Sequence, residues 1–286
     1  MPEPTIESFR SSDGYEWRYR RYAPAGPPKG HLVYLHGIQS HGGWYGFSCE
    51  RLRQAGYQVS FLDRRGSGLN EPARGDAPSF RRLLDDIAEF IRATRKPGAD
   101  AHGSPVFIVA VSWGGKLAVA LQRRHPGLVD GLALLCPGLF PQVRHSFLER
   151  VGIFFSRLVN PTKLYDIPLS DPELFTATPR WLEFLKNDPL AIHRATARLL
   201  VESVRLDFYL RFLCPKHVQA PVLLMLAEKD RIIVNSQTRS YVQRFASLEK
   251  EVIEYPGAQH TLEFEPEPEG FVSELIRWLD RHIACG

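Results

Sequence analysis

The chain has 286 residues, a formal net charge of +4 and an apolar content of 44%. A chain of this length can bury a large core without disulfides or structural metals, and it fits one α/β domain with an insertion. Because the charge is only mildly basic and the arginines are scattered, the composition is far from that of a nucleic-acid-binding protein, and we expect no nucleic acid partner. The four cysteines form no C-x-x-C pair and no metal-ligand spacing. We expect buried or incidental thiols, no metal and no organic cofactor.

The start of the chain carries no targeting pattern. Residues 1–4 lack the basic and apolar regions of a signal peptide. No apolar run along the chain approaches the length of a transmembrane helix. The sequence therefore predicts a cytoplasmic protein.

Strands and helices alternate over most of the chain. The first two predicted strands flank a turn signal at residues 12–14. The later strands are short and almost continuously apolar, which is typical of a parallel sheet that helices cover on both faces. The predicted strands are residues 5–10, 15–22, 31–35, 57–62, 105–109, 129–135, 221–226 and 251–255. One predicted helix ends at residue 55, and the others span residues 80–94, 116–121, 236–246 and 271–282.

The alternation stops after residue 137 and resumes at residue 221. The stretch between them has helical patterns and prolines but no convincing strand. We therefore expect residues 1–137 and 216–286 to form one core, and residues 138–215 to form an inserted helical cap.

A serine stands between a predicted strand and a predicted helix, in the stretch Ala-Val-Ser-Trp-Gly-Gly at residues 110–115. A serine on such a sharp turn is the nucleophile elbow of an α/β-hydrolase, usually written G-x-S-x-G. The turn exposes the hydroxyl of Ser112 and aims the first N–H groups of the helix, including that of Trp113, at a developing oxyanion. Ala110 replaces the first glycine of the pattern. We therefore expect an α/β-hydrolase fold, with a mostly parallel sheet and a cap.

A serine hydroxyl is a weak nucleophile, and it needs a base that a third group orients. In this topology the partners follow in the order Ser, Asp or Glu, and His, on loops after late strands. Asp230 and His260 each follow one of the last two predicted strands. Glu228 is a rival acid, but Asp230 lies further into the loop. The order and placement predict a triad of Ser112, Asp230 and His260.

The loop after the strand at residues 31–35 should supply a second oxyanion donor beside the N–H of Trp113. Ile38 follows a His-Gly pair in this loop, and its backbone N–H is the best candidate. We assign His36 a structural role in bracing the loop, and we assign no role to His41.

Four further stretches form a specific combination. They are the His-Gly loop at residues 36–45, the Asp-x-Arg-Gly-x-Gly turn at 63–68, the Asp-Arg pair at 230–231 and the Gly-Ala-x-His run at 257–260. In combination these motifs resemble those of monoglyceride lipases and lysophospholipase-type serine hydrolases of the α/β-hydrolase superfamily. The resemblance covers both halves of the core.

The resemblance implies the same nucleophile, acid and base, and the same two oxyanion donors. It also implies a structural, non-catalytic role for the turn at residues 63–68. Two residues depart from the family pattern. One is Ala110 in the elbow. The other is Trp113, where the family commonly has a smaller or more flexible residue, which bears on the shape of the acyl pocket.

The predicted function is hydrolysis of a small-molecule carboxylic ester with an apolar acyl group. Two alternatives stay open: a serine peptidase of the prolyl-aminopeptidase type, and a hydrolase relative that binds a ligand and turns it over poorly. Residues 138–216 contain 11 Lys and Arg against 8 Asp and Glu, which disfavours recognition of a free amine. A dehalogenase or epoxide hydrolase is excluded because its nucleophile is a carboxylate.

The stretch at residues 147–159 is strongly apolar, with arginines interspersed. One interpretation is a lid that faces a lipid surface and makes transient contact with it, with a basic rim. The other interpretation is a helix packed onto the core. The sequence leaves both open.

Overall fold

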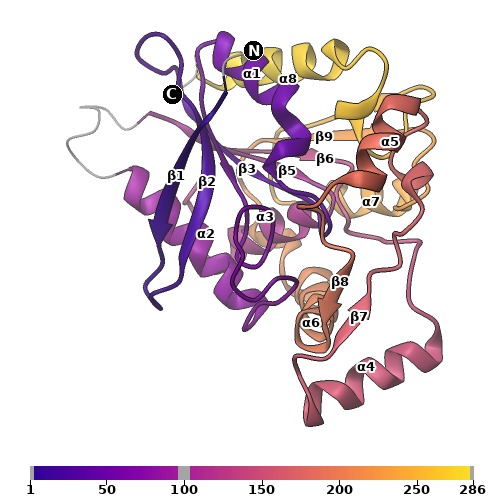
Figure 1. Ribbon diagram of the computed structural model, residues 1–286. Helices are drawn as coiled ribbons and strands as arrows, with labels where there is room; N and C mark the ends of the chain where they lie inside the picture. The colour runs from indigo at the N-terminus through magenta and orange to yellow at the C-terminus, as the bar shows by residue number, and fades with distance from the viewer. Residues whose placement is uncertain (1–2, 96–103, 284–286) are drawn as a thin grey trace.

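An eight-stranded sheet forms the centre of the computed structural model, which describes residues 3–95 and 104–283 (Figure 1). In order across the sheet its strands are β1 (Thr5–Arg10), β2 (Glu16–Tyr22), β4 (Gln58–Leu62), β3 (His31–Leu35), β5 (Val106–Val111), β6 (Gly131–Leu135), β9 (Val222–Ala227) and β10 (Lys250–Tyr255). The β1–β2 and β2–β4 pairs are antiparallel, and every later pair is parallel. The predicted mostly parallel sheet is confirmed.

Helices cover both faces of this sheet (Figure 1). Its central strands are therefore buried at every position. Two helices pack together on one face, α1 (Gly46–Gln54) and α8 (Glu269–Ile283). The other face carries α2 (Phe80–Thr94) and α3 (Trp113–Arg124), while α7 (Asn235–Gln243) joins β9 to β10. The short 3-10 helices are η1 (Gly42–Tyr45), η2 (Pro172–Leu174), η3 (Pro215–His217) and η4 (Leu262–Phe264).

The elements on either side of the serine are longer than predicted. β5 continues through Ala110 to Val111, and α3 begins at Trp113. Ser112 is therefore the one residue between a strand and a helix. This is the geometry that a nucleophile elbow requires.

Residues 138–215 add no strand to the eight-stranded sheet in the described chain. The expectation that they contain no strand is wrong, however, because β7 and β8 pair antiparallel there. Each strand has only three residues, which is too short for a recognisable periodic pattern. The two strands pair only because the folded cap brings them together. In Figure 1 this pair lies beside α4 and α6 at the lower right. The cap elements are α4 (Phe147–Val159), β7 (Leu164–Asp166), α5 (Pro179–Asn187), β8 (Arg194–Thr196) and α6 (Ala197–Leu213).

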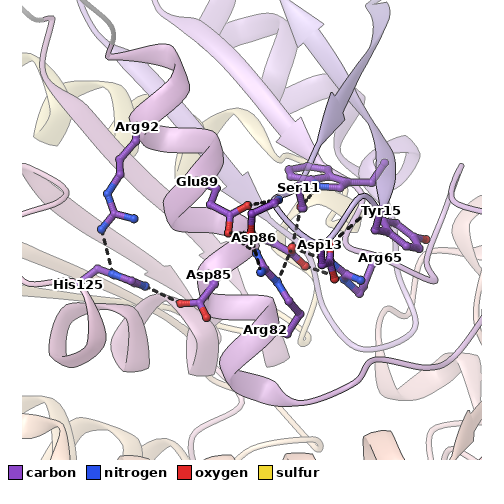
Figure 2. Close-up of polar contacts among 12 residues, drawn as sticks. Ser11, Asp13, Tyr15, Arg65, Arg82, Asp85, Asp86, Glu89, Arg92 and His125 are labelled. Atoms are coloured by element: carbon purple, nitrogen blue, oxygen red, sulfur yellow. Dashed lines mark hydrogen bonds and ion pairs between the residues drawn. The ribbon is translucent and has the colours of Figure 1, made fainter.

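A network of ion pairs around the buried Arg65 holds the loop that follows β4 (Figure 2). Arg65 donates to Asp86 on α2 at 2.7 Å and to Asp13 in the β1–β2 turn at 3.1 Å. Its guanidinium also lies 4.3 Å from the centre of the Tyr15 ring. Arg65 thus ties the turn at residues 63–68 to two other segments, which fits the structural role expected for this turn.

Two further sequence expectations concern membranes and thiols. In the described segments, no helix has both the length and the apolar character that crossing a bilayer demands. Cys49, Cys136 and Cys214 are buried and free. Cys285 and residues 1–2 lie outside the described residues.

Candidate active site

Ser112 has a strained backbone that its neighbours hold in place. Its φ of 52° and ψ of −122° are rare for a residue with a side chain. Its N–H donates to Leu135 O at 3.0 Å, and its carbonyl accepts from Gly138 N at 2.7 Å. These bonds to β6 and the loop after it fix the turn, and Ser112 faces a cavity as a result.

Two glycines after the serine let α3 approach the sheet. A Cβ on Gly114 would lie 2.6 Å from Leu35 O, and one on Gly115 would lie 2.6 Å from Pro137 Cβ. Both distances are far inside van der Waals contact, so larger residues would push the helix away. Ala110, in place of the first glycine of the motif, is fully buried in β5.

The structure brings Asp230 and His260 into contact. Asp230 Oδ2 lies 2.7 Å from His260 Nδ1, and both side chains are almost completely buried. The other carboxylate oxygen accepts the N–H groups of Ile232 at 2.8 Å and Ile233 at 3.0 Å. These bonds fix the carboxylate, so it can orient the imidazole and stabilise its protonated form.

The rival acid Glu228 points elsewhere. It is exposed, and its Oε2 accepts the N–H of Gly257 at 2.7 Å. Glu228 therefore bonds the turn before His260, whereas Asp230 bonds the ring. The opposite ring atom, His260 Nε2, is buried and has no hydrogen-bond partner in the described chain.

Cys136 lies beside the Asp230–His260 pair, a position that the sequence did not predict. Its Sγ, an Asp230 oxygen and a His260 nitrogen lie within 4.8 Å of one another. Burial and the Asp230 carboxylate raise the pKa of the Cys136 thiol well above its usual range. Its sequence position could have indicated this place, because Cys136 directly follows β6. That strand lies between β5 and β9, the strands that precede Ser112 and Asp230.

Sulfur, carboxylate and imidazole are all metal-ligand types. Here the chemistry of the donors disfavours a metal. The His260 and Asp230 atoms already bind each other at 2.7 Å, and metal binding needs a thiolate where burial favours the thiol.

Ile38 and Trp113, the two expected oxyanion donors, line the same cavity as Ser112. A Cβ on Gly37 would lie 3.7 Å from Ser112 Oγ, so the loop before Ile38 lies against the serine. Trp113 opens α3, and the first N–H groups of a helix have no acceptor within it. Within the described residues, neither N–H donates a hydrogen bond. Two free donors beside a nucleophile are what an oxyanion hole needs.

The two histidines of this loop have structural contacts. His36 Nε2 accepts the backbone N–H of Arg64 at 3.1 Å, which assigns the ring proton to Nδ1, 2.7 Å from Gly37 O. Burial lowers the pKa of His36 well below its usual range, so the ring is neutral. His41 Nε2 lies 2.9 Å from Asp188 Oδ2, a contact between core and cap that the sequence did not predict.

The cavity at Ser112 has a volume of about 720 Å³. Its wall is largely apolar, and the cap supplies much of it from α4 and α6. Trp113 Nε1 donates to Ser203 Oγ on α6 at 2.9 Å, which fixes the indole in the wall. The bulky residue at the elbow therefore joins the core to the cap. Apolar lining residues from the cap include Phe147, Phe154, Leu200, Val204 and Phe208.

The charged lining of the cavity is mainly basic. Asp207 is its one acidic lining residue among those described, and Lys116 Nζ lies 2.5 Å from its Oδ1. Arg144, Arg150 and Arg211 also line the cavity. A substrate in the cavity thus meets an apolar wall, a neutralised carboxylate and exposed guanidinium groups.

The sheet order, the strained serine between β5 and α3, and the buried Asp230–His260 pair are those of an α/β-hydrolase. A family model described as "Serine aminopeptidase, S33" (Hydrolase_4) matches residues 26–267. The chain belongs to this family.

Similar proteins extend over nearly the whole chain. A monoacylglycerol lipase of Mycolicibacterium smegmatis is 27% identical over 283 residues, covering 96% of this chain and 97% of its own. The phospholipase YtpA of Bacillus subtilis is 25% identical over 254 residues, covering 88% and 95%. The crystal structure of a soluble variant of Saccharomyces cerevisiae monoglyceride lipase, in complex with a substrate analogue, has a TM-score of 0.87 at 19% identity, covering 99% and 96%.

Proposed function

We propose that this protein hydrolyses carboxylic esters with an apolar acyl group through a covalent acyl-enzyme. Ser112 Oγ attacks the ester carbonyl carbon while His260 accepts the hydroxyl proton. His260 then gives this proton to the departing alcohol, which leaves an acyl group on Ser112. Water, deprotonated by His260, attacks the acyl carbonyl, and His260 returns this proton to Ser112 Oγ as the ester bond to the serine breaks and the carboxylic acid leaves. Asp230 stabilises the imidazolium in both steps.

The N–H groups of Ile38 and Trp113 stabilise the oxyanion in this proposal. The carbonyl oxygen becomes an alkoxide during each attack, so negative charge develops at one place. Donors fixed there in advance stabilise the transition state more than the ground state. Their free N–H groups and their position on the cavity at Ser112 support the assignment.

The observation that carries the choice of substrate is the cavity at Ser112. Its wall is largely apolar, and its one described carboxylate, Asp207, is paired with Lys116. An apolar wall binds an acyl chain. A substrate recognised through a protonated amine would need free carboxylates in the same place. The names of the similar proteins, two lipases and a phospholipase, agree with an ester substrate.

A serine aminopeptidase is the second candidate, because the family description names that activity. The three arginines on the cavity oppose it, since they repel a protonated amine. A relative that binds a ligand but turns over poorly is the third candidate. A cytoplasmic location stays a prediction, which cell fractionation would test.

We also infer that α4 contacts a lipid surface transiently. Leu148 is 80% exposed and Val159 is 84% exposed, and of the 13 residues of α4 only Ile153 and Ser156 are buried. The alternative of a helix packed onto the core does not fit this exposure. An amphipathic helix with an exposed apolar face binds the interface of a bilayer, where lipid substrates reside.

The test of the function compares p-nitrophenyl esters of graded chain length with aminoacyl-naphthylamides, using wild type and Ser112→Ala. We expect a burst of p-nitrophenol from wild type, preference for an ester over every amide, and labelling by a fluorophosphonate that Ser112→Ala abolishes. Faster turnover of an amide would favour the peptidase. Labelling of Ser112→Ala with activity retained would refute the nucleophile assignment.

A further inference from the structure

We propose that Arg64 is a positioning residue that holds both oxyanion donors in place, an inference that rests on the proposed function. Its guanidinium donates from Nη1 to Gly37 O at 2.7 Å and from Nη2 to Ile38 O. It also lies 5.1 Å from the centre of the Trp113 ring. One side chain therefore contacts the residues on both sides of the expected oxyanion hole.

The bonds to the Gly37 and Ile38 carbonyls fix the orientation of the loop. A peptide unit is planar, so fixing the carbonyl of Gly37 also fixes the N–H of Ile38, which belongs to the same peptide. That N–H is the proposed donor. The neutral ring of His36 donates to the same carbonyl, 2.7 Å away. Arg64 and His36 together prevent this peptide from rotating.

The contact with Trp113 acts on the second donor. The guanidinium packs against one part of the indole, while Nε1 of the indole donates to Ser203 on the cap. A Trp held at both places keeps the first turn of α3, and with it the N–H of Trp113, in one position. These two contacts give Trp113, which departs from the family pattern, a structural role at the elbow.

No salt bridge within the described residues neutralises Arg64, and the nearby carboxylate of Asp63 is itself paired with Arg20. The described acceptors of its guanidinium are the carbonyls of Gly37 and Ile38, with no carboxylate among them. Burial lowers the pKa of Arg64 to about 9, so the group is still a cation at neutral pH. Its neighbour Arg65 differs, because it is paired with Asp86 and Asp13. An unpaired cation behind the donors adds electrostatic stabilisation when the oxyanion forms.

The test uses Arg64→Met, which keeps an apolar stem against Trp113 and removes the donors and the charge. We expect kcat for a p-nitrophenyl ester to fall by about 100-fold, with KM within about 3-fold of wild type, as for loss of an interaction made only in the transition state. A trifluoromethyl ketone adds to the serine and places an oxyanion in the hole. Its inhibition constant should rise by the same factor as kcat falls.

The matched control is Arg74→Met. Arg74 also donates to backbone carbonyls outside the site, those of Gly68 and Leu190 at 2.9 Å and that of Ala191 at 3.4 Å. The Arg74→Met variant should keep kcat and the inhibition constant of the ketone near their wild-type values. Fluorophosphonate titration of active sites corrects every rate for misfolded protein. Should Arg64→Met misfold, Arg64→Lys restores one cation and should show the same two effects at a smaller size.

The outcomes separate this inference from the proposed function. A correctly folded Arg64→Met enzyme with wild-type kcat would overturn the inference alone, and so would a lower kcat with an unchanged ketone inhibition constant. A wild-type protein inert toward every ester would overturn the proposed function and this inference with it.

Discussion

Asp230 and Glu228 lie two residues apart, yet their side chains contact different partners. Asp230 binds the His260 ring at 2.7 Å, whereas Glu228 binds the Gly257 N–H at 2.7 Å. Asp230→Asn should leave His260 poorly oriented and lower kcat by about 10⁴-fold, as for the aspartate of a serine protease triad. Glu228→Gln is the matched control and should change kcat little. Steady-state rates on one ester decide this, and a larger loss in Glu228→Gln would show that the acid is wrongly assigned.

Ile38 is expected to act through its backbone, so its side chain can be changed without loss. Proline has no N–H, and Ile38→Pro should therefore lower kcat by about 10²- to 10³-fold, the loss typical of one oxyanion donor. Ile38→Val keeps the N–H and should stay near wild type. The fold of the proline variant must first be verified by circular dichroism.

A folded Ile38→Pro enzyme with near wild-type kcat would place the second donor elsewhere. Gly42 and Gly43 are poor substitutes, because their N–H groups already donate to Asp63 at 2.7 Å and to His41 at 3.0 Å. Gln39 would then be the next residue to test.

At the scale of elements, α1 begins without a side-chain cap from its N-cap residue, Tyr45. Glu263 on η4 supplies one instead, because its Oε1 accepts the N–H groups of Phe47 at 2.9 Å and Ser48 at 3.0 Å. Burial raises the pKa of Glu263 from 4.5 to about 7. The capping contact thus joins the segment after His260 to the helix after the oxyanion loop.

This pKa predicts how stability depends on pH. The folded protein binds the Glu263 proton more tightly than the unfolded chain, so the stabilisation is complete below about pH 4.5 and is lost as pH rises through about 7. The free energy of unfolding should fall by roughly 3 kcal/mol from this group over that interval. Glu263→Gln cannot titrate and should remove this part of the slope. Urea denaturation at several pH values measures it, and equal slopes in both proteins would contradict the prediction.

At the scale of the whole molecule, the cap joins the core through polar contacts near the site and leaves apolar side chains exposed outside it. Lys116 and Trp113 on α3 bind Asp207 and Ser203 on α6. Leu148 and Leu158 on α4 are 80% and 67% exposed. The cap therefore forms the wall of the cavity and also carries the proposed lipid-facing surface.

Replacing both Leu148 and Leu158 by Ser should weaken binding to phospholipid vesicles by about 30-fold, since each side chain contributes about 1 kcal/mol when partly buried in lipid. Hydrolysis of a dissolved short-chain ester should be unchanged. Leu248→Ser is the control, because Leu248 is 97% exposed on the core. Vesicle co-sedimentation measures the binding, and an unchanged partition of the double variant would refute the lipid contact.

Local sequence patterns were enough to predict most of the elements and the residue types of the candidate site. Apolar runs predicted the central strands because burial on both faces leaves no room for polar positions, and the elbow motif predicted the residue between β5 and α3. Order along the chain suggested Asp230 and His260, because parallel strands present their following loops at one edge of the sheet.

The tertiary structure decided what depends on contacts between distant segments. The three-residue strands of the cap and the pairing of His41 with Asp188 leave no local pattern. The apolar pattern of α4 fitted either an exposed or a packed helix, and its exposure follows only from the fold. Cys136 beside Asp230 and Arg64 behind the oxyanion loop are likewise ordinary residues until folding brings their partners to them. Local periodicity encodes an element, but the direction of a side chain and its partners are set by packing of the whole chain.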